Sequence, residues 1–245
     1  MNTLKIVIAA GALATSMVAA APADASIVIG GTRIIYEAGQ AEVNVKLKNE
    51  GAQPALTQAW IDMGDSKAAP GSIDVPFIVT PPVTRIDQGK GQTLRLMHTG
   101  EAMDQDRESV FWLNVLEIPP KDKANQNLLQ MAIRSRIKLF YRPDGLKGDV
   151  EDAPAQVSWR LVKSGNRHAI EAINPTPYHV TFIDVTVVGS GKSAKFTDGE
   201  MLAPGEKKIL PLVGDIAQGA SSEVVYRYLN DYGGAVKGSR ALPPA

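Results

Sequence analysis

Three basic residues alternate along one segment of the sequence and give it a capacity to bind anions. Arg134, Arg136 and Lys138 would share one face of an extended chain, because successive side chains of a strand point to opposite sides. The opposite face would carry apolar side chains, namely Leu129, Met131, Ile133, Ile137 and Leu139. The segment thus combines a cationic stripe with an apolar ladder.

Two interpretations of this segment follow from physical chemistry. In the first, the ladder faces a core, and the cations are solvated or protect a sheet edge from aggregation. In the second, the segment recruits an extended peptide. Backbone hydrogen bonds would then supply affinity, alternate apolar side chains would supply specificity, and the cations would hold a terminal carboxylate. The residues alone leave both interpretations open.

One glycine-rich segment imitates a phosphate-binding loop. Residues 189–193 read GSGKS, but Thr186 stands where the phosphate-binding motif requires its first glycine, and no parallel strand–helix–strand context surrounds the segment. We therefore expect a polar hairpin turn there and no nucleotide partner.

The polar residues show no pattern that is typical of a metal site or of a catalytic site. The histidines lack the spacing of metal ligands; they are His98, His168 and His179. Asp104, Asp106 and Glu108 alternate as calcium ligands do, but the glycine of an EF-hand loop is missing. We expect no metal, no cofactor and no enzymatic activity.

The composition excludes several further classes of protein. The chain has 245 residues, of which 44% are hydrophobic, and its 26 basic residues balance its 26 acidic ones. A packed core is therefore expected, and neutrality gives no basis for a nucleic-acid partner. The absence of cysteine excludes disulfides, thiol catalysis and cysteine-based metal sites.

The first 25 residues have the pattern of a cleaved export signal. Lys5 precedes an apolar run from Ile6 to Val18, and Ala23-Asp24-Ala25 supplies the small residues that a signal peptidase accepts. Ala21 and Ala23 end rival cleavage sites. A membrane anchor is the alternative, but the run is shorter than the roughly 20 residues that a span needs. We expect export, and the lack of cysteine favours a bacterial periplasm.

Short alternating segments predict an all-β fold beyond the signal. Such segments recur around residues 41–47, 129–133, 157–161, 183–187 and 224–228, with turn residues between them. This spacing is typical of β-sandwiches of about 100 residues. We therefore predict two domains, at residues 26–142 and 149–245, joined by the linker Pro143–Asp149.

Several motifs together resemble a known family. Residues 106–120 read DRESVFWLNVLEIPP and residues 136–143 read RIKLFYRP. Three shorter motifs accompany them: TPPVTRI at 80–86, NPTPYHVT at 174–181 and NDYGG at 230–234. In this order they resemble the pilus (fimbrial) chaperones of the chaperone–usher pathway, and they cover nearly all of the predicted mature chain.

The resemblance implies a fold and a function. It implies two immunoglobulin-like domains arranged as an L or boomerang with a cleft between them. Such a protein would bind pilin subunits in the periplasm by donor-strand complementation and deliver them to an outer-membrane usher. The short loop at residues 119–126 resembles the short-loop branch. Self-association of the protein when it is free of client stays open.

The resemblance also implies roles for individual residues. Arg33 and Lys138 would bind the C-terminal carboxylate of a pilin, while Leu129, Met131 and Ile133 would form the donor strand. By strict alternation, however, Lys138 faces away from that ladder, which implies a bulge in the strand or a lysine that reaches around it.

The family further pairs an acid, an arginine and an aspartate across its two domains. These residues correspond to Glu108, Arg142 and Asp231, which we expect to lock the domains together. Three unrelated surface charges are the alternative.

Two other classes of function are less consistent with the sequence. A pilin would have one domain, whereas this chain is long enough for two. A carbohydrate-binding or hydrolytic sandwich would require exposed aromatic residues or paired carboxylates. We expect Trp60, Trp112 and Trp159 to lie in the core instead.

Overall fold

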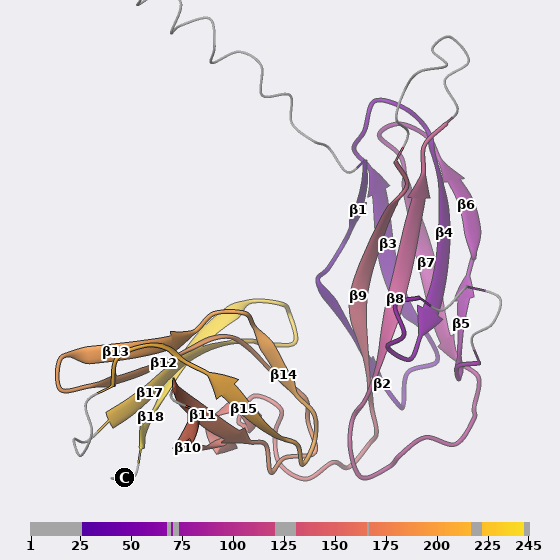
Figure 1. Ribbon diagram of the computed structural model, residues 1–245. Coiled ribbons are helices and arrows are strands. Elements are labelled where there is room, and N and C mark those ends of the chain that lie inside the picture. Colours follow the sequence, from indigo (N-terminus) through magenta and orange to yellow (C-terminus); the bar gives the residue numbers. More distant parts are fainter. Residues whose placement is uncertain are drawn as a thin grey trace, which may run out of the picture.

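The computed structural model describes residues 26–67, 70, 74–120, 131–165, 167–216 and 222–242. The predicted export signal and Leu129 of the ladder lie outside the described residues. The regular secondary structure of the described residues is almost entirely β-strand, as the alternating pattern predicted, and it forms two sandwiches set at an angle to each other (Figure 1).

The first sandwich consists of two sheets. One has the strand order β1-β3-β7-β5, and the other has the order β2-β9-β8-β4-β6. The strands are β1 (Ile27–Ile29), β2 (Arg33–Glu37), β3 (Val43–Asn49), β4 (Ala55–Asp62), β5 (Phe77–Thr80), β6 (Val83–Ile86), β7 (Gly91–His98), β8 (Ser109–Ile118) and β9 (Ile133–Arg142).

Alternation explains how these two sheets close on each other. In β3, for example, Val45 and Leu47 are buried while Lys46 and Lys48 are exposed. Aromatic rings fill the centre of the resulting core, and they meet mainly edge to face. These rings belong to Tyr36, Phe77, Phe111 and Tyr141.

The second sandwich also has two sheets. One has the order β10-β11-β15; the other has the order β16-β13-β12-β17-β18, with β14 also paired to β12. The elements are α2 (Ala153–Gln156), β10 (Ser158–Ser164), β11 (Arg167–Ile173), β12 (Val180–Gly189), β13 (Lys192–Phe196), β14 (Glu200–Leu202), β15 (Lys207–Pro211), β16 (Val213–Gly214), β17 (Ser222–Leu229) and β18 (Ala235–Leu242).

The glycine-rich segment is the hairpin turn that was expected. Gly189 pairs with Lys192 at the end of the β12–β13 ladder. The two residues between them have positive φ, 48° at Ser190 and 74° at Gly191. This is the conformation that a two-residue hairpin turn requires.

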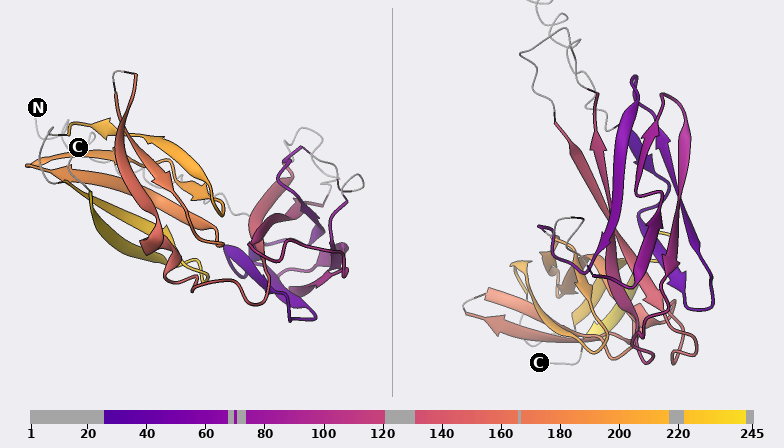
Figure 2. Two further views of the ribbon diagram at one scale, coloured as in Figure 1. Left: turned by 90° about the horizontal axis from the view of Figure 1, so that it is seen from below. Right: turned by 90° about the vertical axis from the view of Figure 1, so that its right-hand side faces the viewer.

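Two separate hydrophobic cores lie on either side of the linker. The first contains residues from Ile27 to Tyr141, and the second begins at Ala153 and has Leu146 and Val150 packed against it. Figure 2 shows that the sandwiches meet only at their ends, which gives the molecule an L shape. Within the described ranges, no helix has the length and apolar character needed to cross a membrane.

All three tryptophans were expected to be core residues, but only Trp60 and Trp159 are buried, whereas Trp112 is partly exposed. Trp159 lies in the second core. Trp60 and Trp112 are absent from the first core cluster and lie on the outer face of the β2-β9-β8-β4-β6 sheet, under arginine side chains. Alternation indicates which residues of one strand share a face, but not which face other residues cover.

Candidate functional site

Strand β9 carries most of the residues that the sequence singled out. It pairs with β8 in one continuous register, from Ile133 opposite Glu117 to Tyr141 opposite Ser109. Its odd-numbered side chains Ile137, Leu139 and Tyr141 pack against the first core. Its even-numbered residues therefore point to the outer face of the sheet.

One edge of β9 is covered along only part of its length. Strand β2 pairs with β9 in parallel from Lys138 to Arg142. From Ile133 to Ile137, β9 pairs only with β8 among the described residues. Ile133 is 37% exposed, and Met131, just before the strand, is 64% exposed. The structure therefore presents an open backbone edge beside exposed apolar side chains.

The continuous register answers one question that the sequence left open. It contains no bulge between Ile133 and Lys138. Lys138 and Ile133, the described ladder residue that belongs to β9, thus lie on opposite faces of the strand, because their positions differ by an odd number of residues.

Arg33 and Lys138 are brought side by side where the covered part of the edge begins. They are register partners of the parallel β2–β9 pair. The Arg33 guanidinium lies 5.5 Å from the centre of the Phe140 ring, and its Nη1 donates a 3.3 Å hydrogen bond to the carbonyl oxygen of Leu229 in the second domain. Both cations therefore lie at the junction of the domains.

The electrostatic surroundings of this pair favour an incoming anion. Burial lowers the pKa of the Lys138 amine, and the neighbouring Arg33 charge lowers it further. Burial also lowers the pKa of Arg33, against the attraction of Asp231 and Glu108. Neither cation has an ion-pair partner among the described carboxylates. A carboxylate placed between them would relieve this repulsion and accept hydrogen bonds from both.

The other two cations of the stripe are already neutralised by Asp62 at the end of β4. Its side chain is only 1% exposed, and it forms ion pairs with both Arg134 (3.4 Å) and Arg136. Burial opposes its ionisation. Hydrogen bonds from Arg136, Asn114 and the Gly64 amide outweigh that effect and lower the pKa of Asp62. The sequence reasoning missed this residue, although a lone acid at the end of an apolar strand was a usable signal.

Neighbouring side chains hold the two arginines over β8 and β4. The Asn114 amide donates to Asp62 at 2.7 Å and its oxygen accepts from Arg134 Nη2 at 2.6 Å. The guanidinium groups of Arg134 and Arg136 lie 4.8 Å from the ring centres of Trp60 and Trp112, respectively. These contacts leave Lys138 as the one cation of the stripe without a carboxylate partner among the described residues.

A second cluster joins the two domains through the last residue of β9. Arg142 Nε donates to Glu108 at 2.8 Å, while its Nη1 and Nη2 donate to Asp231 at 2.7 and 3.1 Å. Burial would lower the pKa of Arg142, but these two carboxylates outweigh it and raise that pKa. The structure thus brings together the three residues Glu108, Arg142 and Asp231.

His179 belongs to this cluster, although the sequence had indicated no role for it beyond excluding a metal ligand. Its backbone amide donates to Glu108 Oε2 at 2.7 Å, and its ring Nδ1 lies 3.2 Å from the same oxygen. Burial would raise the pKa of Glu108, but the contacts with His179 and the Arg142 charge lower it. Glu108 therefore receives hydrogen bonds from both domains.

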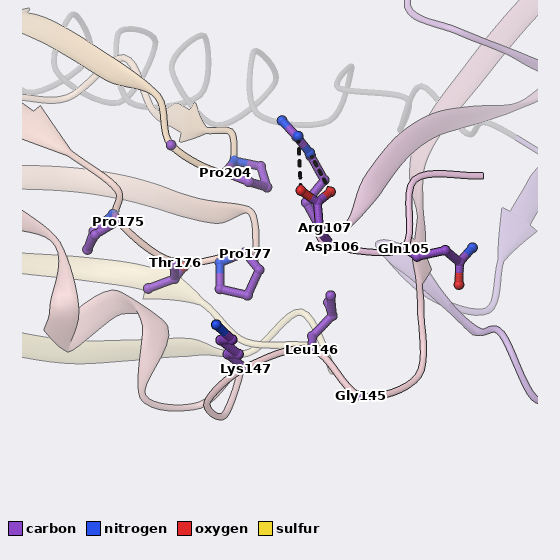
Figure 3. A pocket seen from close by; sticks show the side chains of 11 residues that line it. Gln105, Asp106, Arg107, Gly145, Leu146, Lys147, Pro175, Thr176, Pro177 and Pro204 are labelled. Carbon is purple, nitrogen blue, oxygen red and sulfur yellow. Dashed lines mark hydrogen bonds and ion pairs between the residues drawn. The ribbon is translucent and has the colours of Figure 1, made fainter.

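A pocket of about 490 Å³ lies at the domain junction, between the 105–107 loop, the linker and residues 175–177 and 204–205 (Figure 3). Its Arg107 is paired with Asp106 at 3.0 Å and with Asp104 at 3.7 Å, and all three side chains are exposed. Asp104, Asp106 and Glu108 thus have cationic partners and do not converge on one point. No group of metal-binding side chains occurs among the described residues.

Comparison with known proteins agrees with this geometry. Residues 26–147 match the family model of the pili and flagellar-assembly chaperone PapD N-terminal domain, and residues 152–240 match that of the pili assembly chaperone PapD C-terminal domain. The probable fimbrial chaperone YadV of Escherichia coli K12 is 47% identical over 233 residues, which cover 93% of this chain and 94% of YadV.

Solved structures give the same result. The crystal structure of the YadV chaperone has a TM-score of 0.76 at 45% identity, and the match covers 89% of this chain and 100% of that one. The SafB chaperone complex with the SafA pilin of Salmonella enterica has a TM-score of 0.74 at 29% identity, with 91% and 99% covered. The chain therefore belongs to the PapD-like family of pili assembly chaperones.

Proposed function

We propose that this chain is a periplasmic chaperone that captures pilin subunits by donor-strand complementation and delivers them to an outer-membrane usher. Membership of the chaperone family and the similarity to a chaperone solved with its pilin support this proposal. The predicted export signal at residues 1–25 supports the periplasmic location.

The observation that carries the proposal is the open edge of β9 that ends at Arg33 and Lys138. A subunit strand added to this edge, parallel to β9, would run from Ile133 toward Lys138 and meet the start of β2 there. Its C-terminal carboxylate would then reach the two cations that lack a carboxylate partner among the described residues. Backbone hydrogen bonds would hold the strand, and the charges would fix its end.

The apolar ladder supplies the second part of the proposed interaction. Met131 and Ile133 are exposed here, and burial of each side chain in a subunit groove would contribute about 1.5–3 kcal/mol. Leu129 is proposed as the third member. Because Ile133 and Lys138 lie on opposite faces of β9, the groove and the carboxylate would be engaged from different sides of the same strand.

The cluster of Glu108, Arg142 and Asp231 is proposed to fix the angle between the domains. Arg142 ends β9 and Asp231 follows β17, so the cluster joins the donor strand to the second sandwich. It lies near Leu229, whose carbonyl accepts from Arg33. A fixed angle would keep Arg33 and Lys138 in place before a subunit arrives.

A test uses the tagged full-length protein expressed in its own host, with recovery from the periplasm and identification of bound partners by mass spectrometry. We expect a small secreted β-rich subunit at equal stoichiometry. Lys138→Ala should remove this partner, whereas Lys46→Ala, at an exposed lysine of β3, should retain it. Equal recovery with both variants would contradict the carboxylate anchor.

A further inference from the structure

The outer face of β9 offers three successive cations to a strand added at its edge. Arg134, Arg136 and Lys138 are two residues apart, which is about 7 Å along a strand. A terminal carboxylate that bound one position too early would shift the whole added strand by two residues. The shift by two keeps every side chain on its own face, so alternation alone does not prevent it.

The structure distinguishes the three positions by what already binds them. Asp62 accepts from Nε and Nη2 of Arg136, and it pairs with Arg134 Nη2 at 3.4 Å. Arg134 also donates from Nη1 to the carbonyl oxygen of Ser66 at 2.6 Å. By contrast, Lys138 has only Arg33 as its register partner on β2.

Whether a terminal carboxylate can bind these cations depends on the direction of their side chains as well as on their charge. Asp62 and Trp60 belong to β4, which lies beyond β8 when seen from β9. The stacking of Arg134 on Trp60 and of Arg136 on Trp112 therefore draws both guanidinium groups away from the open edge of β9. Arg33 lies on β2, at that edge.

We propose that Asp62 is a positioning residue that sets the register of the bound subunit, because it occupies Arg134 and Arg136 and leaves only the Arg33–Lys138 pair open to a terminal carboxylate. The inference rests on the proposed function and deepens it. It assigns a role in selecting the register to a buried acid that would not itself touch the subunit.

The absence of cysteine makes the register measurable by disulfide cross-linking. Ser135→Cys places one thiol on β9 between the two arginines in sequence, on the opposite face of the strand from their side chains. The probes are two synthetic peptides of alternating valine and threonine with a free C-terminal carboxylate. One carries cysteine at the third residue from its end, and the other carries it at the last residue. In the correct register, only the cysteine of the first peptide should lie opposite position 135.

We expect the Ser135→Cys protein to cross-link to the first peptide and not to its C-terminally amidated form. Adding Asp62→Asn should free the two arginines, so that the second peptide now cross-links as well, which reports a shift of two residues. Adding Arg134→Gln and Arg136→Gln to that variant removes the competing cations and should restore the single register. Circular dichroism checks that each variant is folded.

The outcomes separate this inference from the proposed function. If the first peptide alone cross-links with and without Asp62→Asn, the register role is wrong while carboxylate capture stands. If both peptides still cross-link after both arginines are replaced, the shift comes from a loss of order in β9 and not from the competing cations. The inference is then also wrong. The Ser135→Cys protein could fail to cross-link to either peptide with a free carboxylate, or it could cross-link equally to the free and the amidated forms. In both cases the proposed carboxylate anchor is wrong, and the inference is wrong with it.

Discussion

Arg142 and Asp231 form a two-pronged ion pair that joins the last residue of β9 to the turn after β17 in the other domain, with N···O distances of 2.7 and 3.1 Å. The guanidinium is nearly buried, and its remaining face contacts Glu108. The same strand therefore carries the proposed donor edge at one end and the domain junction at the other.

Replacing Arg142 or its partner Asp231 should cause unequal losses of stability. Arg142→Ala leaves Glu108 buried with an uncompensated charge, so we expect the free energy of unfolding to fall by about 3–5 kcal/mol. Asp231→Ala removes a partly exposed acid and should cost only about 1 kcal/mol. Urea unfolding followed by tryptophan fluorescence measures both. Equal losses would mean that burial of Glu108 does not determine the cost.

The lowered pKa of Glu108 predicts a dependence of stability on pH. The folded protein binds fewer protons at this site than the unfolded chain, so the ionised carboxylate stabilises the fold above its ordinary pKa of 4.5, and this contribution is lost as pH falls below that value. Glu108→Gln should be least stable relative to the parent protein near neutral pH, and the gap should shrink in acid. A gap of constant size from about pH 7 to about pH 3 would contradict this assignment.

The sequence predicted the fold and much of the candidate site because both depend on local patterns. Alternation identified the strands, and ordered motifs identified the family and the residues Arg33, Lys138 and Arg142. Contacts between side chains on different strands could not be predicted from these local patterns. Asp62 and Arg134 are 72 residues apart and meet only because β4, β8 and β9 are neighbours in one sheet.

The same limit explains why the position of Trp60 and Trp112 on the outer face was not predicted. Trp60 and Trp112 have the apolar character of core residues, and nothing in their own segments indicates that arginines of β9 will cover them on the outer face. His179 was missed for a related reason, since its backbone amide contacts Glu108 at 2.7 Å, closer than its ring does at 3.2 Å.

Lys138 has no carboxylate partner among the described residues, and its charge predicts a conflict between stability and function. Its pKa is lowered in the fold, so the charged amine destabilises the free protein at pH values below its folded pKa, and the penalty disappears above the ordinary value of 10.5. Lys138→Met should therefore raise the Tm by a few degrees, where about 1 kcal/mol corresponds to about 2–4 °C for a chain of this size.

The same variant should lose subunit capture, because the carboxylate loses a charge-assisted hydrogen bond worth about 1.5–3 kcal/mol. Lys46→Met, at an exposed lysine, serves as the control and should change neither property. Differential scanning calorimetry gives the Tm. A lower Tm for Lys138→Met would show that this lysine supports the fold and that the conflict does not exist.

Met131 offers the sharpest test of the apolar ladder, because the chain contains a matched control. Met131 is 64% exposed, and Met63, which follows the end of β4, is 67% exposed. Replacing either with glutamate should leave the free protein folded, since neither side chain is in a core. Met131→Glu, however, would bring a charge into the groove of the subunit and forfeit about 1.5–3 kcal/mol of apolar burial.

We therefore expect Met131→Glu to weaken binding of a purified client pilin by at least about tenfold and Met63→Glu to leave the affinity unchanged. Isothermal titration against the client measures both constants. Equal affinities for the two variants would place the donor segment outside the neighbourhood of Met131, whereas equal losses would point to a general effect of added negative charge. Only a loss confined to Met131→Glu supports the ladder, because the two substitutions differ in position and not in chemistry.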